Sequence, residues 1–144
     1  MSKLRGVSGA RKRAKQRPDA LGGFVNVAIS ETVNAVHHAG RANIDAMVKR
    51  RRGVLRRRYS KTVRKPVFTG FVGYITAKSR RAAFYARFVH DGTKTATARP
   101  FHDLAVAEQE RRHSQRMRGA LKKSISASGP SGLARTGRGK VRGL

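Results

Sequence analysis

The sequence predicts an α+β domain: a long N-terminal amphipathic helix packed on a small antiparallel sheet, with a C-terminal helix and flexible basic tails. Three observations predict it. Apolar residues recur at intervals of three and four over residues 24–48, a β-branched and aromatic run follows at 67–76, and a second helical pattern begins at Pro100. The 144 residues, 38% of them apolar, suffice for one small domain, which we expect over residues 19–125.

The first helix is predicted over residues 24–48. It follows a basic N-terminal arm, residues 1–18, expected to be flexible and to end at Pro18, with Asp19 as a candidate cap. The cations that precede Gly53 suit a helix C-terminus, so we expect the helix to end at that glycine. Its apolar stripe, in which one step is a glycine, comprises Val25, Ile29, Val33, Val36, Gly40, Ile44 and Met47.

A strand is predicted over residues 67–76, where apolar residues occupy both alternating faces, as in a strand covered on both sides. Residues 82–90 are apolar again, and Ser79, Arg80 and Arg81 could turn between the two runs. We therefore expect a hairpin, although the second run could equally end in a helical turn.

The last helix is predicted to begin at Pro100, since proline suits the first position of a helix. Beyond Gln109 its apolar residues become sparse, so we expect it to project from the core up to about Ser124. Residues 126–144 are mostly Gly, Ser, Lys and Arg, which predicts a flexible basic tail.

Charge is the strongest compositional signal, because 34 Lys and Arg against 7 Asp and Glu give a formal net charge of +27. An isolated chain of this charge repels itself, so we expect a polyanion or an acidic protein neighbour. Nucleic acid is the commonest such partner. The candidate contacts to DNA or to an acidic partner lie in the cationic run from 49 to 65: Lys49, Arg50, Arg51, Arg52, Arg56, Arg57, Arg58, Lys61, Arg64 and Lys65.

The residues do not predict an enzyme. Without cysteine, thiolate chemistry and cysteine-ligated metals are excluded. The adjacent His37 and His38 point about 100 degrees apart on a helix and cannot share one ion. We find no nucleophile motif beside a histidine, so we expect no catalytic residue, metal site or cofactor. No apolar run reaches the roughly 18 residues of a membrane span, so no membrane contact is expected.

The most specific segment is residues 85–93, YARFVHDGT, followed after a short loop by ARPF at 98–101. It resembles the signature of a tail-component family of long-tailed phages, the relatives of the tenth gene product of a lambdoid phage, and the resemblance covers about residues 20–125. His90 stands where the family usually has an acid. The matching residues, which we expect to hold the fold, are Tyr85, Ala86, Phe88, Val89, Gly92, Thr93, Pro100, Phe101 and Leu104.

Three of these residues have specific expected roles. Gly92 permits a positive φ at the turn, Pro100 starts the last helix, and Phe101 staples that helix to the strands. Tyr85 and Phe88, with Val89, would pack between helix and sheet or between subunits.

The resemblance implies a virion protein that forms a ring of its own copies, a homohexamer in this family, at the head-tail junction or upper tail. There it would complete or terminate the tail, contact neck or connector proteins and tail-tube or tail-terminator proteins, and let genomic DNA pass. Before assembly it would lie in the host cytoplasm. The alternative is a non-specific nucleic-acid-binding protein of the ribosomal or nucleoid kind, which explains the charge but not the motif.

Overall fold

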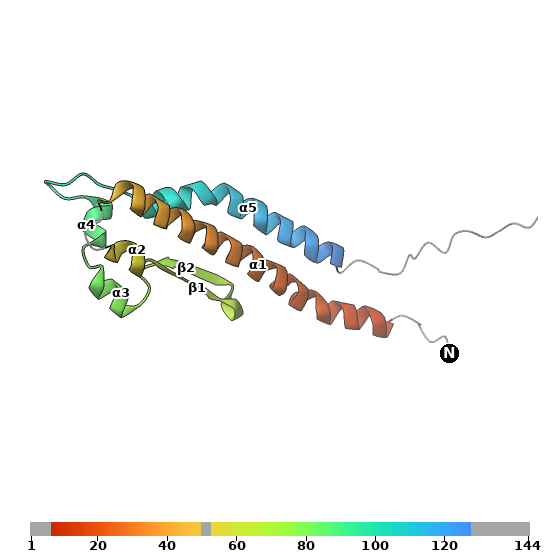
Figure 1. Cartoon of the computed structure of the whole chain (residues 1–144). Coiled ribbons are helices and arrows are strands. Elements are labelled where there is room, and N and C mark those ends of the chain that lie inside the picture. Colours follow the sequence, from red (N-terminus) through yellow and green to blue (C-terminus); the bar gives the residue numbers. More distant parts are fainter. Residues whose placement is uncertain (1–6, 50–52, 128–144) are drawn as a thin grey trace, which may run out of the picture.

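The computed structural model describes residues 7–49 and 53–127, with side chains from residue 19 onward. The predicted α+β fold is confirmed, and Figure 1 shows α1 with α5 along one side and the hairpin and short helices on the other. The described helices include none long and apolar enough to cross a membrane. The elements are α1 (Val7–Met47), α2 (Val54–Arg58), β1 (Ser60–Arg64), the 3-10 turn η1 (Lys65–Val67), β2 (Thr69–Gly73), α3 (Ala77–Ala82), α4 (Ala86–Asp91) and α5 (Phe101–Ala127).

Helix α1 begins earlier and ends earlier than predicted. It starts at Val7 and continues through Pro18, and residues 10–16, which precede the proline, are strong helix formers. Its end is Met47, so the prediction that it ends at Gly53 is wrong. Gly53 instead lies directly before α2. Its φ of 63° is in the left-handed region, which suits glycine.

The predicted apolar stripe of α1 is confirmed as the buried face over Ile29, Val33, Val36 and Ile44. Helix α5 packs along α1 rather than projecting from the core beyond Gln109, so that prediction is wrong (Figure 1). The reason is that small side chains let two helices approach closely. The residues that α5 buries are Phe101, Ala105, Gln109, Ala120 and Ser124.

The sheet is a two-stranded antiparallel hairpin in which Thr62 pairs with Phe71. Strand β2 confirms the centre of the strand predicted at 67–76, but its partner β1 precedes it, inside the cationic run. Thr62 and Val63 give β1 the β-branched character that the neighbouring cations obscure.

The predicted second strand, residues 82–90, is wrong, because this run closes α3 and forms α4. The predicted turn at Ser79–Arg81 lies inside α3. Thr76 and Ser79 form a reciprocal capping box: the Ser79 N–H donates to Thr76 Oγ1 at 3.1 Å, and the Thr76 N–H donates to Ser79 Oγ at 3.0 Å. This capping box sets the start of α3 at Ala77, where the sequence had predicted the end of a strand and a turn. The helical alternative for residues 82–90 is the one that the structure adopts.

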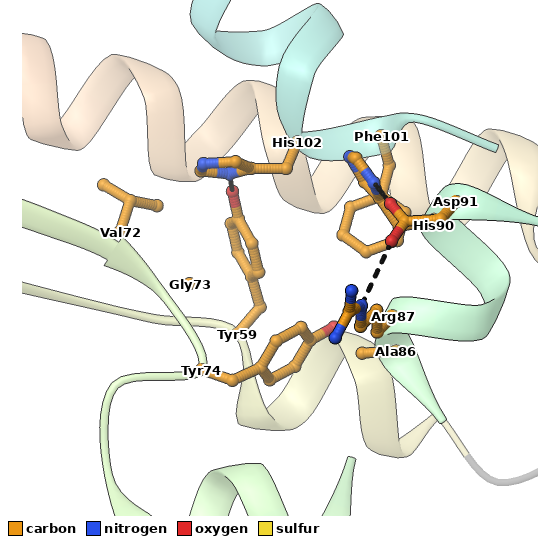
Figure 2. A pocket seen from close by; sticks show the side chains of 10 residues that line it. All are labelled: Tyr59, Val72, Gly73, Tyr74, Ala86, Arg87, His90, Asp91, Phe101 and His102. Atoms are coloured by element: carbon orange, nitrogen blue, oxygen red, sulfur yellow. Dashed lines mark hydrogen bonds and ion pairs between the residues drawn. The ribbon is translucent and has the colours of Figure 1, made fainter. Parts of the chain in front are cut away.

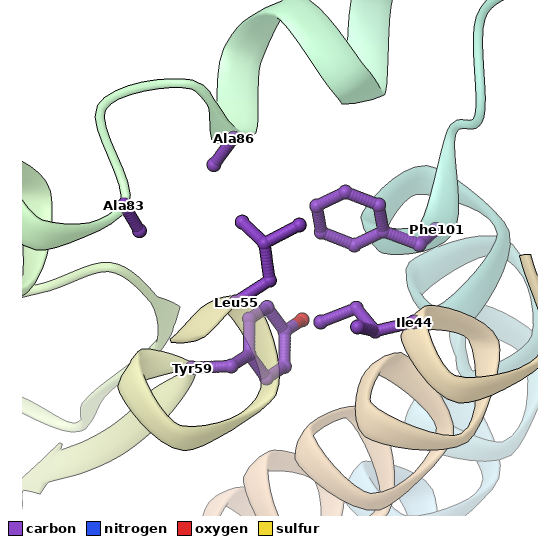
Figure 3. Close-up of a cluster of buried hydrophobic side chains, with 6 residues drawn as sticks. All are labelled: Ile44, Leu55, Tyr59, Ala83, Ala86 and Phe101. Atoms are coloured by element: carbon purple, nitrogen blue, oxygen red, sulfur yellow. The ribbon is translucent and has the colours of Figure 1, made fainter. Parts of the chain in front are cut away.

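A buried apolar cluster joins the C-terminal end of α1 and the first residue of α5 to α2 and to the segment between α3 and α4 (Figure 3). Tyr59 lies at its centre, in edge contact with Phe101 and Tyr74. The Tyr59 ring lies so close to Gly40 of α1 that a methyl group on that glycine would not fit. The cluster comprises Ile44, Leu55, Tyr59, Ala83, Ala86 and Phe101.

Candidate functional site

The motif segment 85–93 forms α4 and its C-terminal turn. Ala86 is buried in the apolar cluster, and Tyr85 and Val89 pack against it. The backbone N–H of Arg99 donates to the carbonyl oxygens of Val89 at 3.0 Å and His90 at 3.1 Å, which ties the following loop to the end of α4. This segment therefore positions the start of α5.

Gly92 has the positive φ that the sequence predicted, at 80°. A Cβ atom on Gly92 would lie 2.8 Å from the Ala98 nitrogen and 2.9 Å from the Ala96 oxygen. Thr93 supports the same turn, because its Oγ1 accepts a hydrogen bond from the Ala96 N–H at 3.0 Å. The turn thus needs glycine for both its conformation and its space.

Phe101 anchors the N-terminus of α5, directly after Pro100. Its side chain is 2% exposed, and its carbonyl oxygen accepts a hydrogen bond from Asn43 Nδ2 of α1 at 3.0 Å. The expected staple is confirmed, and it joins α5 to α1 as well as to the residues around the hairpin.

Two motif residues do not pack inside this chain. Phe88 is 57% exposed and Leu104 is 46% exposed. Phe84, in the turn that precedes α4, is 72% exposed. The expectation that Phe88 packs between helix and sheet is therefore wrong within one chain, while packing between subunits stays a prediction.

A pocket of about 300 Å³ lies between α4, the start of α5 and Tyr59 (Figure 2). The Tyr59 hydroxyl lies 2.7 Å from Nδ1 of His102. His90 places Nδ1 2.7 Å from Asp91 Oδ1 and Nε2 3.5 Å from Asp103 Oδ1. The pocket thus has aromatic walls and a rim of histidine and carboxylate groups.

Burial controls the protonation of the groups around Tyr59. It lowers the pKa of His102 and of His37, whose ring stacks on Tyr59. It raises the pKa of Tyr59 to about 12 and raises the pKa of Tyr74 as well. At neutral pH these four side chains are therefore uncharged and serve packing and hydrogen bonding. His37 is half-buried, and its Nε2 donates to the Tyr59 carbonyl oxygen at 3.1 Å.

Some predicted cationic contacts are engaged within the chain. Arg56 Nε lies 2.8 Å from Asp45 Oδ2 of α1, and Lys61 Nζ donates to Asn34 Oδ1 at 2.6 Å. The Arg64 guanidinium carbon lies 5.5 Å from the centroid of the Phe71 ring. Lys49, Arg57 and Lys65 are exposed and Arg58 is half-buried, while Arg50, Arg51 and Arg52 lie outside the described residues.

Further exposed cations lie on α3, which the sequence interpretation had treated as a turn: Lys78, Arg80 and Arg81. One signal could have identified them. Between Asp45 and Asp91 the sequence holds fourteen Lys and Arg and no acid, so the cationic region extends well past Lys65.

The arrangement offers surfaces for binding and a histidine-rimmed pocket. In the described ranges 19–49 and 53–127, no three His, Asp or Glu side chains gather closely enough to hold a metal ion. Comparison of the chain with protein-family models, with curated proteins and with solved structures gives no match.

Proposed function

We propose that this protein is a structural subunit of a ring at the head-tail junction or upper tail of a tailed virus particle. The ring joins or completes the tail and leaves a channel for the genome. Two lines support the proposal: the resemblance of residues 85–101 to the tail-component signature, and the distribution of exposed apolar side chains. The second line is physical and carries the argument.

Among the exposed large apolar side chains of the described residues, two pairs lie at separate places in the fold, and we treat each pair as a patch. The α4 patch consists of Phe84 and Phe88, which are 72% and 57% exposed. The α5 patch consists of Leu121 and Ile125, which are 47% and 71% exposed and lie one helical turn apart. Exposed apolar side chains that gather in this way mark interaction sites.

The two patches lie at opposite ends of the α1–α5 pair (Figure 1). Helix α5 alone separates its first turn from Ile125 by roughly 30 Å at about 1.5 Å per residue. Two different patches at opposite ends of a subunit favour a head-to-tail contact, which closes into a ring when the rotation per subunit permits it. A two-fold dimer would instead need one self-complementary patch.

Mixing two variants tests this geometry. Phe88→Glu removes the α4 patch and Ile125→Glu removes the α5 patch, so neither variant alone should form a ring. A mixture should form heterodimers, since each variant keeps the patch that the other lacks. Native mass spectrometry measures these states, and Val27→Glu, at a site on α1 that is 56% exposed, is the matched control.

Electron microscopy of tailed particles from the source supplies the second test. The proposal requires this chain in a ring between the portal and the tail tube. Intact particles that lack the chain, or a mixture of the two variants that restores full rings, would contradict it.

A further inference from the structure

The segment that contains the hairpin and α3, residues 57–81, carries many positive side chains and no acidic one. From Arg57 to Arg81 the sequence has eight Lys and Arg and no acid. The cationic second half of α5 differs, because Arg112 lies 4.0 Å from Glu108 on α5 and Arg116 lies 3.8 Å from Glu31 on α1. The hairpin and α3 lie on the side of α1 away from most of α5 (Figure 1).

Strand alternation determines which hairpin residues point outward. Gly70 contacts Ile29 and Val33 of α1, and its partner in the register is Val63. Lys61, two positions from Val63, reaches Asn34 of α1. Because successive side chains point to opposite faces, Arg64 and Phe71 lie on the outer face of the hairpin.

Arg64 and Phe71 form a cation–π pair on this outer face. The guanidinium carbon lies 5.5 Å from the ring centroid, and Phe71 is 43% exposed. The exposed Arg64 guanidinium thus lies beside an aromatic ring at the surface, and exposed Lys65 in η1 follows it in the chain. Any cationic side chain can bind a phosphate, whereas an arginine guanidinium beside an aromatic ring can also stack on the face of a nucleic-acid base.

We propose that this outer face binds single-stranded nucleic acid. An unpaired base stacks on the Arg64 guanidinium, which Phe71 supports, and Lys65, the next residue, neutralises a phosphate. Lys78 and Arg81 of α3 lie beyond the other end of the hairpin and extend the cationic surface there. Arg80 is exposed too, but its Nη1 already donates to the Ile75 carbonyl oxygen at 3.0 Å, so it is not among the proposed phosphate contacts. The proposal does not depend on ring formation, because the hairpin face shares no residue with the α4 or α5 patch.

Variants that conserve charge test the stacking role, since the terminal segments are also strongly cationic and would bind any polyanion. Arg64→Lys keeps the charge and loses the planar group, and Phe71→Ala keeps the charge and removes the support. The probe is a fluorescently labelled 20-nucleotide single strand of mixed sequence, compared by anisotropy with the duplex of the same sequence. The full chain is titrated at several salt concentrations.

Both variants should weaken single-strand binding by about 5- to 100-fold, the range expected for loss of one base stack. Duplex binding should change by less than about twofold, and the salt dependence should stay the same because no phosphate contact is lost. Arg118→Lys on exposed α5 and Val27→Ala on α1 are the matched controls and should leave both affinities unchanged. Thermal melts followed by circular dichroism verify that each variant is folded.

Three results would overturn the inference. Equal losses for single strand and duplex would mean that the face contacts phosphates only. Unchanged single-strand binding in both folded variants would mean that the pair takes no part. Tighter binding to polyglutamate than to the single strand would indicate an acidic protein as the partner.

Discussion

The Tyr59 hydroxyl and Nδ1 of His102 lie 2.7 Å apart, and this pair links the hairpin module to the first turn of α5. The same tyrosine binds α1 from its other end, because its carbonyl oxygen accepts a hydrogen bond from His37 at 3.1 Å. Tyr59 is 3% exposed. One residue between α2 and β1 therefore connects all three parts of the fold, and two histidines are its polar partners.

Stability should fall as the pH falls below about 6.5. Burial lowers the pKa of His37 and His102 from 6.5 in the folded state, so the unfolded chain binds more protons there. The free energy of unfolding therefore rises with pH between the lowered pKa of the folded state and 6.5. The contribution of the two histidines is fully present above pH 6.5 and is lost as the pH falls toward the pKa of the folded state. Urea denaturation between pH 5 and 8 measures it, and His102→Gln, which keeps a hydrogen-bonding side chain that does not titrate, should flatten the dependence. An unchanged slope in that variant would exclude His102 as a source.

Gly40→Ala should destabilise the protein by about 1–3 kcal/mol, the range for overpacking a closely packed core. The new methyl group would collide with the Tyr59 ring, which the apolar cluster prevents from moving. Gly23→Ala on the same helix is the matched control. No atom lies within 4 Å of its Cβ position, so the substitution should stabilise α1 by roughly 0.5–1 kcal/mol. Urea denaturation should therefore give opposite signs for the two variants, and equal signs would show that Tyr59 does not pack on α1.

Periodicity predicted the parts of the fold that depend on one helix face. The stripe containing Ile29, Val33 and Ile44 is buried as expected, and Phe101 is buried where the motif placed it. In these cases the local pattern and the tertiary contact agree, because the apolar residues themselves make the contact.

The rest depended on contacts that composition hides. β1 was missed because its two β-branched residues, Thr62 and Val63, lie between Lys61 and Arg64. The α1–α5 contact was missed because Ala120 and Ser124 are too small to form an obvious apolar face. The outer pair of Arg64 and Phe71 could not be predicted, since it requires the register of a hairpin whose first strand was not recognised. Each failure concerns a long-range pairing rather than a local propensity.

Gly92→Ala should destabilise the protein by about 2–5 kcal/mol. Gly92 has a φ of 80° and a ψ of 178°, a conformation that is essentially confined to glycine, and the new methyl group would also collide with backbone. The collision would be with Ala96 and Ala98, on the far side of the loop. Gly53→Ala is the comparison: Gly53 has the milder left-handed conformation, with a φ of 63° and a ψ of 18°, and no atom lies within 4 Å of its Cβ position, so only about 1–2 kcal/mol is expected. Thermal or urea denaturation measures both. Equal losses at the two glycines would mean that the loop at 93–98 moves away from α4 in solution.

Phe101→Ala should lower the folding stability of the chain, whereas Phe88→Ala should lower its self-association. Phe101 is 2% exposed and lies in the apolar cluster, so its truncation should cost about 3–5 kcal/mol of folding free energy. Phe88 is 57% exposed, so its truncation should change the stability of the monomeric chain by less than about 0.5 kcal/mol, while it weakens self-association at the α4 patch. Denaturation of dilute protein and native mass spectrometry of concentrated protein separate the two effects. A large loss of monomer stability in Phe88→Ala would show that this ring is covered by its own chain in solution, and the α4 patch would then not exist as an interaction surface.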